Sequence, residues 1–169
     1  MGNWLGRGTR DYKLDGDLSY LSEARLSGVG NILRIFGHRT PKVYVDAKIL
    51  NMHDPSLRRE AYVGYVVEGS ERKNVKRVEA QESDDAEVLA VLFAIEELGS
   101  LGGFTVVCDH ESVVSEARRD RVRNPSALLQ KLRETLRAHP RVRLEALQSN
   151  PAHQVVTEYV NAMKTSAES

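Results

Sequence analysis

Hydrophobic and polar positions along the chain follow two different spacings, which together predict an α/β domain. Short apolar runs bounded by turn residues predict strands at 42–49, 61–68, 75–81, 104–108 and 142–147. Longer segments with helical spacing predict helices at 86–98, 111–119, 126–138 and 152–163. This order indicates one mixed five-stranded sheet, an antiparallel meander extended by parallel strands, with helices on its faces.

Residues 1–41 precede this pattern and predict a separate N-terminal extension that is partly helical. Its apolar residues follow helical spacing with a break at 27–30, and Thr40-Pro41 marks the boundary to a domain at 42–169. Apolar residues of this kind more often pack on a domain or a partner than bind substrate. We therefore expect a protein partner or self-association through residues 1–41.

Composition narrows the class of protein. The chain has 169 residues, 41% of them apolar, so we expect a hydrophobic core of normal size. Its formal net charge is zero, so overall charge does not attract nucleic acid. The single cysteine, Cys108, stands inside a predicted strand, which favours a small core side chain over a nucleophile and excludes an internal disulfide. We find no signal peptide or spanning segment and expect an intracellular, cytoplasmic protein.

Three acidic residues interrupt apolar runs in a way that predicts a metal site. Asp46 follows the apolar run 43–45, Asp109 follows the run 104–108, and Glu87 is the one acid within the apolar run 86–95. A buried carboxylate is costly unless something pairs with it, and divalent cations bind converging carboxylates. Two such ions can hold the attacking and leaving oxygens of a phosphoryl displacement.

Each acid also has a simpler interpretation. Glu87 follows Ser83 closely enough to be a first-turn acid behind a serine N-cap, Asp109 could cap the helix that begins at 111, and Asp46 could be a turn residue. Taken one at a time, the simpler interpretation equals the metal site for Glu87 and is slightly favoured for Asp46 and Asp109. Taken together, the three positions favour the site.

The segments 43–47, 62–65, 83–95 and 106–114 resemble, in order and spacing, the type 1 ribonuclease H family. The resemblance covers roughly residues 42–163, and the helix motif around Glu87 is its most specific part. It implies a ribonuclease H-like fold and Mg²⁺ or Mn²⁺ held by Asp46, Glu87 and Asp109. It further implies two-metal hydrolysis of the RNA strand of RNA/DNA hybrids, leaving a 3′-hydroxyl and a 5′-phosphate.

The fourth acid of that family has no acidic counterpart here. When Pro151 is matched to the family's loop proline, the fourth acid falls on Thr157, whose neutral hydroxyl can hold a metal-bound water but cannot neutralise a divalent charge. His153 lies one helical turn earlier on the same face, and an imidazole can bind Mn²⁺ or move a proton. A surface residue at the start of a helix is the more common interpretation of such a histidine.

A basic segment follows the third acid. Residues 117–143 carry nine lysines or arginines against two acids. We expect substrate phosphates to contact the first four, namely Arg118, Arg119, Arg121 and Arg123. The stretch 131–137 reads instead as the solvated face of a helix.

Two functions therefore stay open on the sequence. The first is a metal-dependent endonuclease acting on RNA in RNA/DNA hybrids, with Thr157 or His153 completing the site. The second is a catalytically weak or inactive module of the same fold that binds nucleic acid or assembles with other proteins. The loss of a single acid favours the first.

Overall fold

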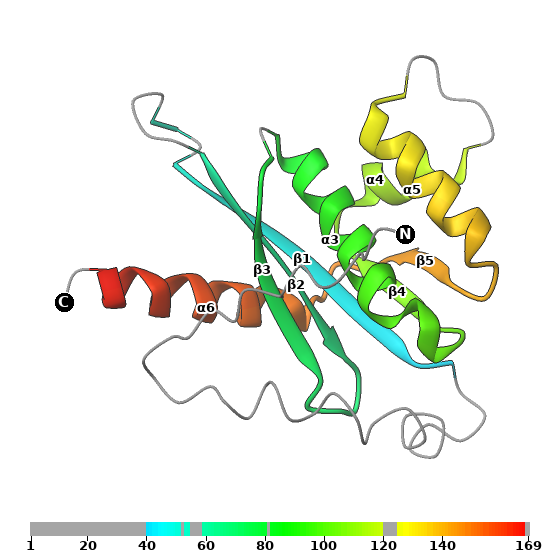
Figure 1. The fold of residues 1–169 in the computed structure, drawn as a ribbon, viewed down its shortest axis with the longest axis horizontal. Coiled ribbons are helices and arrows are strands. Elements are labelled where there is room, and N and C mark those ends of the chain that lie inside the picture. The colour runs from blue at the N-terminus through cyan, green and yellow to red at the C-terminus, as the bar shows by residue number, and fades with distance from the viewer. Residues whose placement is uncertain (1–39, 52, 55–58, 81, 120–124, 168–169) are drawn as a thin grey trace, which may run out of the picture.

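The structure is a computed structural model that describes residues 40–51, 53–54, 59–80, 82–119 and 125–167 (Figure 1). The expected extension at 1–41 lies almost wholly outside the described residues, as do Arg121 and Arg123, so these expectations stay predictions. The elements in chain order are β1 (Lys42–Leu50), β2 (Glu60–Val67), β3 (Lys73–Val78), α3 (Ser83–Leu98), η1 (Gly99–Leu101), β4 (Thr105–Cys108), α4 (Glu111–Arg118), α5 (Ala127–Ala138), β5 (Arg143–Ala146) and α6 (Pro151–Ala167).

The strands form one mixed sheet in the order β3-β2-β1-β4-β5. β1, β2 and β3 pair antiparallel, whereas β4 pairs parallel to β1 and β5 parallel to β4. The central strand β1 therefore joins the antiparallel half to the parallel half. This sheet confirms the α/β fold predicted from the sequence.

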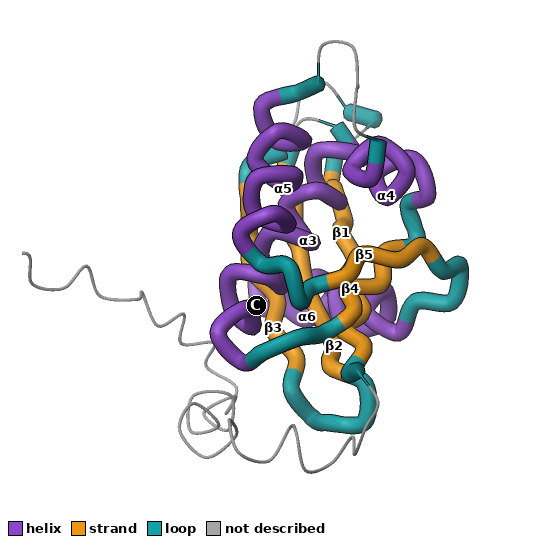
Figure 2. Tube along the Cα trace, turned by 90° about the vertical axis from the view of Figure 1, so that its right-hand side faces the viewer, coloured by secondary structure: helices purple, strands orange, loops and turns teal. Residues whose placement is uncertain are grey.

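Helices cover both faces of the sheet (Figures 1 and 2). α3 packs on β1 and β2 on one face, with α4 and α5 beside it, and α6 crosses the other face over β1, β2 and β3. Because side chains alternate along a strand, Val63 enters the core beneath α3 while its neighbour Tyr62 packs on Val156 and Val160 of α6. The α3 side holds the larger core.

Gly64 allows α6 to lie close to the sheet. Gly64 pairs with Asp46 in the β1–β2 ladder, so both face α6. A Cβ at Gly64 would stand 2.7 Å from Cγ2 of Val156 and 3.0 Å from Cγ2 of Val75. Since Val156 is fully buried, α6 would have to move outward to admit any side chain there.

Candidate metal centre

Two of the predicted acids lie where the parallel strands separate. The last parallel pair between β1 and β4 is Val45 with Cys108. Asp46 and Asp109 are the residues that follow this pair. The sequence placed Asp46 at a strand end, but β1 continues to Leu50 and pairs only with β2 there. At this point the parallel pairing with β4 ends, but the strand β1 continues. Asp46 is therefore not a turn residue.

Glu87 reaches the same place from α3, which begins one turn earlier than expected. Glu82 occupies the N-cap position without a side-chain cap bond, and the acids of the first turn are Asp84 and Asp85. Glu87 lies past that turn and is only 5% exposed. Neither helix capping nor first-turn charge therefore explains this buried carboxylate.

Asp109 is not a helix cap either. His110 holds the N-cap position of α4, again without a side-chain cap bond. Nδ1 of His110 lies 3.0 Å from Oγ of Ser112 and 3.6 Å from Oδ1 of Asp84, so it links the starts of α3 and α4. Asp109 itself is exposed, which leaves its carboxylate accessible from solvent.

Burial and nearby negative charge raise the pKa values of Asp46 and Glu87. Burial, followed by the charges of Asp46 and Asp109, raises the pKa of Glu87 to about 8. Burial and the Asp109 charge also raise the pKa of Asp46, to about 6, although His153 and Lys48 act in the opposite direction. The charge of Asp109 therefore acts on both buried carboxylates, and the charge of Asp46 acts on Glu87.

Oδ2 of Asp46 is buried without a hydrogen-bond partner. Nδ1 of His153 is 3.4 Å away, near enough for an ion pair, but the geometry does not meet that of a hydrogen bond. A buried unpaired oxygen costs free energy unless another group satisfies it. The Asp46 carboxylate is also near enough to Glu87 and Asp109 for their charges to interact, and carboxylate oxygens are the ligands of hard divalent cations.

The donor set fits Mg²⁺ or Mn²⁺ better than a soft metal. Ligand atoms of Glu87, Cys108 and Asp109 lie within 4.8 Å of one another. Cys108 donates to Oε2 of Glu87 over 3.7 Å, and burial raises the pKa of its thiol, so the thiol keeps its proton. Cys108 is buried, as expected, and it also orients Glu87. Carboxylate oxygens then remain as the ligands, and they suit magnesium and manganese.

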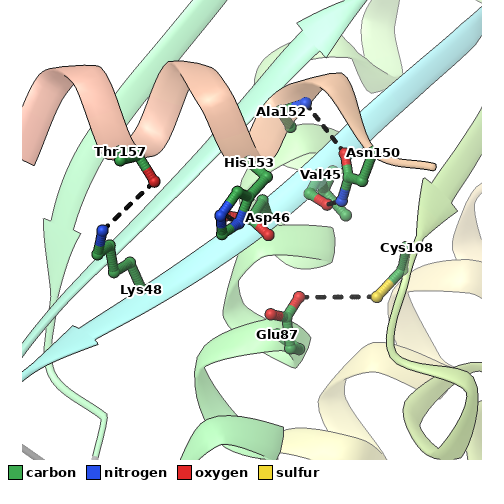
Figure 3. A network of polar contacts seen from close by, with 9 residues as sticks. All are labelled: Val45, Asp46, Lys48, Glu87, Cys108, Asn150, Ala152, His153 and Thr157. Atoms are coloured by element: carbon green, nitrogen blue, oxygen red, sulfur yellow. Dashed lines mark hydrogen bonds and ion pairs between the residues drawn. The ribbon is translucent and has the colours of Figure 1, made fainter. Parts of the chain in front are cut away.

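Asn150, which the sequence analysis missed, fixes α6 against the site (Figure 3). Its Nδ2 donates to the carbonyl of Val45 over 2.6 Å, and its Oδ1 accepts from the backbone of Ala152 over 3.0 Å. One side chain therefore caps α6 and holds the helix beside the strand of Asp46. The dipeptide Asn150-Pro151 is an N-cap signal that the sequence already contained.

The first turns of α6 bring His153 and Thr157 over β1, but to different partners (Figure 3). His153 faces Asp46, whereas Oγ1 of Thr157 accepts from Nζ of Lys48 over 3.3 Å. The exposed His153 is thus the α6 residue paired with a site acid. The catalytic roles expected of His153 and Thr157 stay predictions.

The described part of the basic segment comprises the end of α4, the helix α5 and the start of β5. Arg118 donates to the carbonyl of Leu144, and Arg133 donates to the carbonyls of Glu116 and Arg119. The stretch 131–137 is therefore more than a solvated face, because Arg133 ties α5 to the end of α4. Arg118 and Arg119 remain exposed, which is compatible with the expected phosphate contacts.

No family model matches the chain, and no curated protein matches its sequence. Solved structures do match. The solution structure of the ribonuclease H domain of prototype foamy virus has a TM-score of 0.52 at 16% identity, covering 64% of this chain and 79% of that domain. The fold is therefore ribonuclease H-like.

Two larger foamy viral structures match the same fold. The native protease-reverse transcriptase of prototype foamy virus has a TM-score of 0.55 at 17% identity over 67% of this chain. The foamy viral protease-reverse transcriptase in complex with an RNA/DNA hybrid has a TM-score of 0.56 at 14% identity over 70% of this chain. This chain matches 18% of the length of each of those proteins.

One expectation concerned membranes. Among the described residues, none of the helices is both long and apolar enough to span a bilayer. The apolar helix α3 is buried against β1 and β2, with α4 and α5 beside it.

Proposed function

We propose that this chain is a metal-dependent endonuclease that hydrolyses the RNA strand of RNA/DNA hybrids, with Mg²⁺ or Mn²⁺ held by Asp46, Glu87 and Asp109. One observation carries the proposal: Oδ2 of the buried Asp46 has no hydrogen-bond partner, in a carboxylate whose charge acts on Glu87 and which the charge of Asp109 reaches. A bound divalent ion would supply Lewis-acid activation of water and charge stabilisation at the phosphate.

The chain's own groups supply the remaining requirements. Asn150 and Cys108 orient the site from α6 and β4 by donating to Val45 and Glu87. Exposed Arg118 and Arg119 are proposed to contact phosphates, with Arg121 and Arg123 extending the same segment. The substrate is proposed from the sequence resemblance and from the foamy viral relative, which was solved with an RNA/DNA hybrid.

The test is a cleavage assay with 5′-labelled RNA in a hybrid, in duplex RNA and as a single strand, each with Mg²⁺ or Mn²⁺. We expect cuts in the hybrid only, with 3′-hydroxyl and 5′-phosphate ends. Asp46→Asn should abolish cleavage and weaken Mn²⁺ binding measured by calorimetry. Glu68→Gln is the matched control, because this exposed acid follows β2 and contacts Tyr44, at the other end of β1.

A second function has its own supporting observation. Lys48 places a positive charge, and His153 an imidazole, near Asp46, and Thr157 offers no negative charge in return. These features would weaken metal loading and favour a module that binds nucleic acid with little turnover. Hybrid binding without cleavage by the parent protein, at any Mg²⁺ or Mn²⁺ concentration, would support this alternative over the nuclease.

A further inference from the structure

The α6 side of Asp46 is built from positive and neutral groups. Lys48 lies two residues after Asp46 on β1, so both side chains leave the same face of the sheet, beneath α6. Nζ of Lys48 donates to Oγ1 of Thr157 over 3.3 Å, and Nδ1 of His153 is 3.4 Å from Oδ2 of Asp46 (Figure 3). Among the described residues, the groups that act on Asp46 from this side are His153 and Lys48, and neither is an acid.

Packing of the neighbouring strand against α6 fixes the position of Lys48. Lys48 pairs with Tyr62 in the β1–β2 ladder, and Tyr62 is buried against Val156 and Val160 of α6. The ammonium is thereby held at the edge of the packed face, where Thr157 accepts one of its three N–H donors. Its charge reaches the site, since it favours the ionised form of Asp46.

Charges on the other side of Asp46 are opposite in sign. Glu87 and Asp109 converge there with ligand atoms within 4.8 Å of each other, and the charge of Asp46 acts on Glu87, so in the proposed site these three acids would share one ion. A second ion on the α6 side would have one anionic ligand, Asp46, and would meet Lys48 as a like charge. The described residues thus offer one good cation position, between the three acids. On the α6 side of Asp46, the ammonium of Lys48 already supplies positive charge.

We propose that Lys48, held by Thr157, supplies beside Asp46 the positive charge that a second divalent ion would otherwise supply, so that the chain loads a single ion. This inference rests on the proposed function for its biological meaning, but the ion count can be tested without it. It also gives Thr157 a role: the hydroxyl is the acceptor that holds Lys48, not a weakened metal ligand.

The experiment counts Mn²⁺ ions per chain by calorimetry and by electron paramagnetic resonance of free Mn²⁺. The parent should bind one ion. Thr157→Asp should still bind one, because the introduced carboxylate pairs with Lys48. The double variant Lys48→Met with Thr157→Asp should bind two, since it lacks the ammonium and gains a ligand, whereas Lys48→Arg with Thr157→Asp should stay at one because it keeps the charge.

Lys42→Met is the matched control, because Lys42 begins the same strand at the other end of the β1–β4 pairing and its loss should leave the count unchanged. Two ions in the parent would overturn the inference, and this result requires no variant to fold. A count of one in the charge-free double variant, with native circular dichroism, would overturn it as well.

Hybrid cleavage separates this inference from the proposed function. If the counts follow the expected pattern while no variant cuts hybrid, the role of Lys48 stands and the nuclease proposal fails. If the parent cuts hybrid but binds two ions, and Lys48→Met cuts as fast as the parent, the nuclease proposal stands and the role of Lys48 fails.

Discussion

Glu87 offers a quantitative test of the site through protein stability. Its pKa is raised from 4.5 to about 8 in the folded chain, so in the absence of metal the folded state holds a proton that the unfolded state releases. Stability should therefore fall as the pH rises from about 4.5 to about 8, and stay low above that range. The ionised carboxylate costs the folded state on the order of 5 kcal/mol, at about 1.36 kcal/mol per pH unit.

Glu87→Gln removes this penalty while keeping the shape of the side chain. In EDTA at pH 9 we expect the variant to be more stable than the parent by at least about 2 kcal/mol, less than the full penalty because water can enter beside exposed Asp109. In urea unfolding this difference appears as a higher midpoint at unchanged slope. At pH 4.5 the parent and variant should be equally stable.

Bound metal should make the parent more stable than Glu87→Gln. Mn²⁺ at pH 8 should stabilise the parent, because an ion that binds only the folded state shifts the equilibrium towards it, and should stabilise Glu87→Gln much less. Glu97→Gln is the control, since Glu97 is an exposed acid on the same helix. The reasoning is refuted if Glu87→Gln is no more stable than the parent at pH 9, or if its advantage is the same at every pH.

Three further predictions concern what holds the site in place. Gly64→Ala should destabilise the chain by about 1–3 kcal/mol in urea unfolding, because its Cβ would overlap Val156; equal stability would contradict the close packing of α6. Asn150→Ala should cost about 1–2 kcal/mol and weaken Mn²⁺ binding, whereas Asn150→Asp should keep the helix cap but lose the bond to Val45. Deletion of residues 1–39 should leave a cooperative domain, shown by a single unfolding transition; loss of folded structure would refute the boundary at Thr40-Pro41.

Much of the fold could be predicted because each apolar run buries a face of one element. The run at 86–95 gave α3, whose inner residues are almost all buried. β3 was shifted, predicted at 75–81 but observed at Lys73–Val78, because it is an edge strand with largely exposed or half-buried residues and little apolar pattern. The last turn of α6 was missed for a similar reason, as its described residues there are mostly exposed and polar.

For the site, the sequence identified some residues but not others. Asp46, Glu87 and Asp109 could be identified because each charge interrupts a buried run, and a local pattern records that interruption. The contacts of Asn150 and Lys48 join residues 105 and 109 positions apart, and they depend on where α6 crosses the sheet. A pattern within one segment carries no information about that crossing.

The crossing itself depends on a residue without a side chain. Gly64 stands opposite Asp46 in the ladder, and its missing Cβ lets Val156 reach the sheet. His153 and Thr157 lie within one turn of Val156, so the same approach brings His153 to Asp46 and Thr157 to Lys48. An apolar contact therefore sets which charges surround Asp46. It follows that substitutions at Gly64 should alter metal binding as well as stability, although Gly64 has no group that could bind a metal.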